Sequence, residues 1–283
     1  MTRRTERIYR ELEKYLKDKE ITSEEEMQEE IKKFMDRYNS QTAQKKVKDA
    51  RDYLDMAYEA DNEKDALKYA KKALQLDKNC LDAEVIIEEL TTEDMEVLKV
   101  RYEKLITKTE KRLKEAGIWT DENIGSFWDI VETRPYLRLR YSYLQLLINH
   151  GNFRKAIKEC EDLLLLSKHD NLGVRHILMS LHAFFEDEVN ANRLLKQYVE
   201  DTSTPMLLPM IALYYKLDNY KKAEMYLKKL NRVNHELVDF LFDLEDLENL
   251  RDFENLEMEE VINTGMYRVG SKEEIKVAIM DSP

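Results

Sequence analysis

The chain has 283 residues, of which 43% are hydrophobic and 37% are charged, with 6 glycines and 4 prolines. The hydrophobic share exceeds that of disordered chains, and the scarcity of glycine and proline excludes turn-rich β folds. The net charge of −12 disfavours nucleic-acid partners, which proteins bind largely by neutralising phosphates with Lys and Arg. The composition therefore predicts an all-α protein.

The cysteines and the apolar segments of the sequence indicate where in the cell the protein is expected. Cys80 and Cys160 lie far apart and form no CxxC pair, so we expect neither a disulfide framework nor a metal site. The N-terminus lacks the apolar core of a signal peptide, and the longest uncharged run, residues 202–215, is 14 residues long. That run is too short to cross a bilayer. We expect a soluble, cytoplasmic protein without membrane contact.

Residues 1–43 are expected to form a helical hairpin. The second helix begins at Ser23, which Glu26 follows three residues later in the pattern of a capping box. Its first turn is acidic, which does not suit a helix that reads DNA. Apolar residues recur at helical spacing in both helices: Ile8, Leu12 and Leu16, then Met27, Ile31 and Phe34.

A repeat of about 34 residues is the strongest pattern in residues 44–238. An alanine that allows two helices to approach recurs at 156, 191 and 223, at intervals of 35 and 32 residues, and Ala66 marks an outlying unit. The units lie near 47–80, 137–170, 172–205 and 204–237, joined across 80–137 by a helical stretch that stops near Gly117. We expect a right-handed helical solenoid of the tetratricopeptide (TPR) type, although Asp218 replaces the turn glycine of its last unit.

The segment Phe127–Arg140 carries a family resemblance. Its pattern, FWxxxETRPYxRxR, resembles a group of bacterial TPR proteins that is distantly similar to the suppression-of-tumorigenicity-seven family, and residues 170–175 are a second shared element. The resemblance covers roughly residues 44–237. It implies a helical repeat fold without a known reaction. Some relatives carry a cysteine-rich metal motif near the C-terminus, which this chain lacks because no cysteine follows Cys160.

The same segment concentrates charge in Glu132, Arg134, Arg138 and Arg140. Arginine forks bind carboxylates with two parallel hydrogen bonds, so the cluster is a candidate site for an anion or a peptide carboxylate. The alternative interpretation is an internal ion-pair network that fixes the segment in place. The sequence leaves both open.

Catalysis requires a positioned nucleophile, base or metal, and the sequence supplies no recognisable set. The five histidines show no i, i+4 pair that would place two metal ligands on one helix face. We therefore expect a non-enzymatic protein without a cofactor, which binds a protein or a peptide. The alternatives are a regulatory peptide receptor whose terminal segments respond to the ligand, and an enzyme with an unrecognised composite site.

The first helix of each TPR unit lines the concave face of the solenoid, and its inward positions are the candidate peptide-binding residues. Aromatic and arginine side chains are favoured anchors in such interfaces. Counting from the expected unit starts gives, in addition to Arg134 and Glu132, the candidates Arg138, Tyr141, Gln145, His176, Ser180 and Tyr215.

Residues 239–283 are expected to form an acidic cap or tail. Residues 236–283 hold 14 acidic and 4 basic side chains, so most of the net charge of the chain lies there. A polar cap that closes the last repeat is one interpretation, because solenoids require such caps for solubility. The other is an internal ligand whose acids meet Arg138 and Arg140; removing the segment would then increase the binding of acidic peptides.

Overall fold

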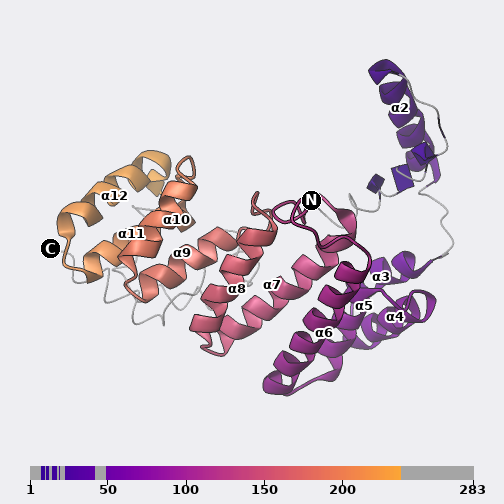
Figure 1. The fold of residues 1–283 in the computed structure, drawn as a ribbon, viewed down its shortest axis with the longest axis horizontal. Helices are drawn as coiled ribbons and strands as arrows, with labels where there is room; N and C mark the ends of the chain where they lie inside the picture. Colours follow the sequence, from indigo (N-terminus) through magenta and orange to yellow (C-terminus); the bar gives the residue numbers. More distant parts are fainter. Residues whose placement is uncertain are drawn as a thin grey trace. The chain divides into compact units, whose positions relative to one another are not determined.

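The computed structural model describes residues 23–41 and 49–236, together with scattered residues between 8 and 19. The described residues form eleven α-helices and one short 3₁₀ helix (Figure 1), which confirms the prediction of an all-α fold. None of these helices is long and apolar enough to cross a membrane. The predicted acidic cap, residues 239–283, lies outside the described residues. The helices are α2 (Glu24–Gln41), α3 (Ala50–Tyr58), α4 (Glu63–Leu76), α5 (Leu81–Thr91), α6 (Met95–Glu115), η2 (Val131–Thr133), α7 (Arg134–Asn149), α8 (Phe153–Leu166), α9 (Val174–Phe184), α10 (Glu188–Gln197), α11 (Thr204–Lys216) and α12 (Tyr220–Val233).

The chain divides into two compact units, each of which is described by itself. Unit 1 comprises Met1–Ile106 and Asp129–Leu139, and unit 2 comprises Thr107–Trp128 and Arg140–Pro283. In unit 1, helix α2 begins as its sequence predicts, because the Ser23 hydroxyl accepts a hydrogen bond of 3.1 Å from the Glu26 backbone N–H. The Tyr15 ring lies against the Phe34 ring on α2, with a centroid distance of 5.5 Å.

Helix α4 of unit 1 packs against both α3 and α5. Small side chains permit this close approach: Ala70 and Ala73 of α4 are fully buried, whereas Ala66, the alanine of the sequence repeat, is only partly buried. Helix α3 begins at a capping box in which the Asp49 carboxylate and Asp52 bond reciprocally with each other's backbone N–H groups. The core of this part consists of Leu54, Ala57, Ala70, Ala73, Ala83 and Ile86.

Helix α9 organises the packing of unit 2, because it contacts α8, α10 and α11, and α11 in turn contacts α12. The helices thus pack in sequential pairs, and the first helices of two successive pairs, α9 and α11, lie beside each other (Figure 1). The repeat alanines of this unit are buried: Ala156 and Ala191 are completely buried, and 7% of the surface of Ala223 is exposed. They lie on the second helix of each pair, where a larger side chain would push the helices apart.

The turns that follow α7, α9 and α11 share one backbone geometry. Gly151, Glu186 and Asp218 all adopt left-handed conformations, with φ of 67°, 58° and 55°. After each of them, the next backbone N–H donates to a carbonyl five residues earlier, as a Schellman turn requires. These bonds run from Asn152 to Leu147 (2.8 Å), from Asp187 to His182 (2.9 Å) and from Asn219 to Tyr214 (2.8 Å).

The left-handed residues 151, 186 and 218 recur at the same intervals as the buried alanines. Only the first of them is a glycine, so the packing of the helices imposes this conformation on Glu186 and Asp218 at a local cost in backbone energy. The left-handed turn therefore occurs at Asp218, where the sequence repeat lacks its usual glycine, and also at Glu186, which the repeat pattern did not mark.

Candidate functional site

In unit 1, the arginine-rich segment enters the start of α7, and Arg138 pairs with Asp82 of α5. The guanidinium donates two bonds to the carboxylate, from Nε to Oδ1 (3.0 Å) and from Nη2 to Oδ2 (2.6 Å). Only 18% of the Arg138 side chain and 10% of the Asp82 side chain are exposed. The fork that could bind a peptide carboxylate is thus occupied by a carboxylate of the chain.

In unit 2, Arg140 has equivalent partners on α8. Its guanidinium donates from Nε and Nη2 to the two carboxylate oxygens of Glu159, the second bond measuring 2.7 Å, and from Nη2 to Asp162 (3.1 Å). Arg140 and Glu159 are both buried. The pair therefore ties α7 to α8 in a setting of low dielectric, where the loss of either partner would leave a buried charge.

The other two members of the predicted cluster are placed differently. Glu132 is exposed on η2, and Arg134 is buried at the first position of α7. The carboxylates that pair with Arg138 and Arg140 belong to Asp82, Glu159 and Asp162, none of which the sequence motif contains. These contacts have the form that the internal-network interpretation expects. An external carboxylate would have to displace them.

The remaining candidates lie on three first helices and differ in exposure. Tyr141 and Gln145 on α7 and His176 on α9 are half-buried. Ser180 on α9 is buried, so its hydroxyl is not on an accessible surface. Tyr215 on α11 is half-buried and lies edge-on to the exposed ring of Tyr220, with a centroid distance of 5.5 Å.

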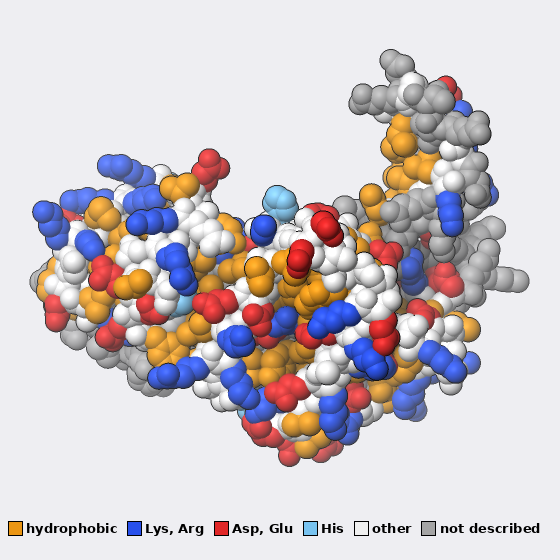
Figure 2. Space-filling view, in the orientation of Figure 1, with side chains coloured by type: hydrophobic (Ala, Val, Ile, Leu, Met, Phe, Trp, Pro, Cys, Tyr) orange, Lys and Arg blue, Asp and Glu red, His pale blue; other side chains and the backbone are white. Residues whose placement is uncertain are grey.

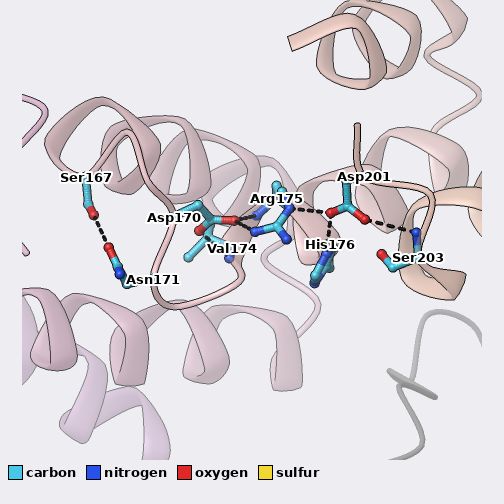
Figure 3. A network of polar contacts seen from close by, with 8 residues as sticks. All are labelled: Ser167, Asp170, Asn171, Val174, Arg175, His176, Asp201 and Ser203. Carbon is cyan, nitrogen blue, oxygen red and sulfur yellow. Dashed lines mark hydrogen bonds and ion pairs between the residues drawn. The ribbon is translucent and has the colours of Figure 1, made fainter. Parts of the chain in front are cut away.

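A polar network at the start of α9 contains His176 from the predicted set, whereas its other members were not predicted as site residues (Figure 3). Asp170 adopts a left-handed conformation, with φ of 47°, and its carboxylate accepts hydrogen bonds from the backbone N–H groups of Val174 (2.7 Å) and Arg175 (3.0 Å). These groups belong to the first turn of α9, which has no intrahelical acceptor for them. The Asp170 carboxylate therefore stabilises the first turn of α9 from three residues before its N-cap residue, Gly173, which gives the shared element 170–175 a structural role.

Arg175 links Asp170 to the start of α11. Its guanidinium donates to Asp170 (2.8 Å) and to Asp201 (2.6 Å), and the other Asp201 oxygen accepts from the Ser203 backbone N–H (3.0 Å) just before α11. His176 Nε2 lies 3.1 Å from Asp201. A single guanidinium thus joins the acids that lie at the starts of two adjacent helices (Figure 3).

The electrostatics of the network follow from burial and pairing. Burial lowers the pKa of His176, although the bond to Asp201 acts in the opposite direction. Burial raises the pKa of Asp201, but hydrogen bonds from Ser203, Arg175 and His176 outweigh it and hold that pKa well below its usual range. At neutral pH the network therefore contains ionised Asp201 beside the neutral form of His176, with Arg175 as its cation.

An open depression of about 390 Å³ lies beside the network. The Arg175 guanidinium lies 5.4 Å from the centroid of the Tyr198 ring at its edge. Since Arg175 already pairs with two carboxylates, the depression is poorly suited to an anionic ligand. Its lining consists of His169, Arg175, Gln197, Tyr198, Val199, Glu200 and Asp201.

Neither cysteine offers an activated nucleophile. Burial raises the pKa of Cys80 to about 11 and that of Cys160 well above its usual value, so both are thiols at neutral pH. Within residues 23–41 and 49–236, no three His, Cys, Asp or Glu side chains gather so as to hold a metal ion.

Comparisons of the chain with protein-family models, with curated proteins and with solved structures found no match. The contacts and charges of the described residues are therefore the basis for any assignment of function.

Proposed function

We propose that the chain is a non-catalytic scaffold that binds a protein or peptide through a TPR-like solenoid. The observation that carries this proposal is the repetition in unit 2. Three successive helix pairs close with the same left-handed turn, and the first helices of two pairs, α9 and α11, pack directly against each other. Helix pairs that stack in this way present their first helices on a common face, which suits an extended ligand.

The shared turns allow the residues of the three first helices to be aligned with one another. Tyr141, His176 and Leu208 each precede the left-handed residue of their turn by ten positions. Gln145, Ser180 and Ala212 precede it by six, and Ile148, Ala183 and Tyr215 precede it by three. Equivalent positions in stacked repeats line the same face, so these nine residues define the proposed binding face.

On α9 and α11, the residues of this face differ in exposure. Ser180 and Ala183 on α9 are buried, whereas His176 on α9 and Leu208, Ala212 and Tyr215 on α11 remain half-exposed. An aromatic ring, an imidazole and two small or aliphatic side chains form a mixed surface of modest polarity. Such a surface favours a peptide or helix held by apolar anchors over an anionic small molecule.

The test places a bulky charge on the proposed face. Ala212→Arg adds a long cation at a half-exposed position without removing a packed side chain, so it obstructs a bound peptide. Affinity-tagged full-length chain and the Ala212→Arg variant are used to capture partners from the native host, and the captured proteins are quantified by mass spectrometry. We expect at least a tenfold loss of the specific partner from the variant.

Ala116→Arg is the matched control, because Ala116 is exposed directly after α6 and belongs to none of the three helices that carry the proposed face. It is expected to capture the partner as the unmodified chain does. Circular dichroism melting verifies that both variants fold. Equal capture by the unmodified chain and both variants would contradict the proposed face.

A further inference from the structure

The outer face of α12 carries a stripe of exposed cations. Lys221, Met225, Lys228 and Arg232 follow one another at the spacing i, i+4, i+7 and i+11, which places them within about 60° of each other around the helix at 100° per residue. All four are exposed, Met225 to 53%. The opposite side of α12, formed by Ala223, Tyr226 and Leu230, is buried. We call the four exposed residues the α12 stripe.

The cations of the stripe have few partners among the described residues. Lys228 forms a surface pair with Glu224 on its own helix, at 2.5 Å. No carboxylate of residues 49–236 lies within ion-pair distance of Lys221 or Arg232. Figure 2 shows Lys and Arg side chains gathered over α12. The stripe therefore differs from Arg138, Arg140 and Arg175, each of which has carboxylate partners.

The acidic part of the same chain begins close to the end of α12. Residues 239–260 contain ten acidic side chains and one basic side chain, and they start six residues after Val233. Asp239, Asp243 and Asp246 recur at i, i+4 and i+7, the spacing of the stripe. The stripe covers about 17 Å of helix at 1.5 Å per residue, and a segment as long as residues 239–260 can extend well beyond that distance.

We propose that residues 239–260 dock on the α12 stripe of their own chain, with the carboxylates of that segment on Lys221, Lys228 and Arg232 and its apolar side chains on Met225. Exposed ion pairs are individually weak and are screened by salt. Attachment to the same chain compensates by holding the two charged segments at a high effective concentration. In this proposal the acidic segment binds the stripe, and not Arg138 and Arg140 as the sequence-based hypothesis had it.

Zero-length cross-linking of the full chain tests this contact. A carbodiimide joins lysine amines to neighbouring carboxylates, and the linked peptides are identified by mass spectrometry. Lys221 and Lys228 are expected to link to acids within residues 239–260. Lys155 and Lys158, which are exposed on α8, are the internal controls and are expected to give few such links. A mixture of unlabelled and ¹⁵N-labelled chains distinguishes links within a chain from links between chains.

Charge reversal tests the same contact without relying on a reactive lysine. Hydrogen exchange in residues 239–260 is expected to become severalfold faster in the variant Lys221→Glu/Lys228→Glu/Arg232→Glu. The control Arg154→Glu/Lys155→Glu/Lys158→Glu reverses three exposed cations on α8 and is expected to leave that exchange unchanged. Adding Asp239→Lys/Asp243→Lys/Asp246→Lys to the stripe variant is expected to restore slow exchange.

Three results would overturn the proposal. The first is equal cross-linking of α8 and α12 lysines to residues 239–260, which would indicate no preferred surface. The second is linking mainly between differently labelled chains, which would make a second copy the occupant. The third is exchange in residues 239–260 that reversal of the stripe does not change.

Discussion

The arginines of α7 and α9 and the cations of α12 have the same charge and opposite surroundings. Arg140 is buried against Glu159, and Arg175 joins the acids at the starts of α9 and α11. Lys221 and Arg232 of α12 are exposed. The difference teaches that a cluster of arginines in a sequence is not in itself a binding site. Buried cations with partners hold helices together, whereas exposed cations remain available to a ligand or to another segment.

The largest expected effect in this comparison is that of Arg140. Arg140→Met removes the cation and leaves Glu159 buried without its partner, so we expect a loss of about 3 kcal/mol in the free energy of unfolding. Urea denaturation measures it. The double variant Arg140→Met/Glu159→Leu removes both charges and is expected to recover most of that loss. If Arg140→Met alone lowers the free energy of unfolding by less than about 1 kcal/mol, the pair of Arg140 and Glu159 does not stabilise the packing of α7 on α8.

A smaller effect is expected at Arg175. Arg175→Lys keeps the positive charge but loses the planar fork that reaches Asp170 and Asp201 together, which should cost about 1–2 kcal/mol. The matched control is Arg193→Lys on α10, whose side chain is 71% exposed, and its unfolding free energy should change by less than about 0.5 kcal/mol. If the two substitutions changed the free energy of unfolding equally, the network around Arg175 would contribute no more to stability than an exposed arginine does.

The response to pH also separates the two regions. Burial lowers the pKa of both His176 and His182 on α9, so the folded chain binds fewer protons there than the unfolded chain does. Stability should therefore fall as the pH is lowered from about 7 through the ordinary histidine pKa of about 6.5. The α12 stripe contains no histidine.

Thermal unfolding between pH 7.5 and 5.5 measures this response. His182→Gln should flatten the pH dependence, because it removes a histidine whose pKa burial lowers. A pH dependence that His182→Gln does not alter would show that this histidine is protonated equally in both states.

The smallest effect is expected on the α12 stripe itself. Arg232→Gln removes one exposed cation, and we expect the free energy of unfolding to change by less than about 0.5 kcal/mol. Urea denaturation at low salt measures it beside Arg140→Met. A loss as large as that of the buried arginine would mean that the stripe is part of the core structure.

The sequence predicted the all-α class, because composition and helical periodicity are local patterns. The buried alanines at 156, 191 and 223 have the same intervals as the left-handed residues at 151, 186 and 218. A helix pair needs a small residue at its crossing and a sharp turn before it, so the alanine marks the turn even where Glu186 or Asp218 replaces glycine.

The partners of the arginines were not predictable in the same way. Asp82 lies 56 positions from Arg138, and Glu159 lies 19 positions from Arg140, so tertiary packing decides these pairs. The network of Arg175 was missed for the same reason, since Asp201 is 26 positions away. The one local signal was Asp201 itself, two residues before Ser203 and the proline-containing first turn of α11, a pattern typical of a helix start.

The proposed binding face on α9 and α11 is tested most directly by hydrogen exchange of the full chain with and without the partner recovered from the native host. Slower exchange is expected in α9 and α11 on binding, and no such protection is expected with Ala212→Arg. Protection confined to α8, α10 or α12, or protection that Ala212→Arg leaves intact, would contradict it.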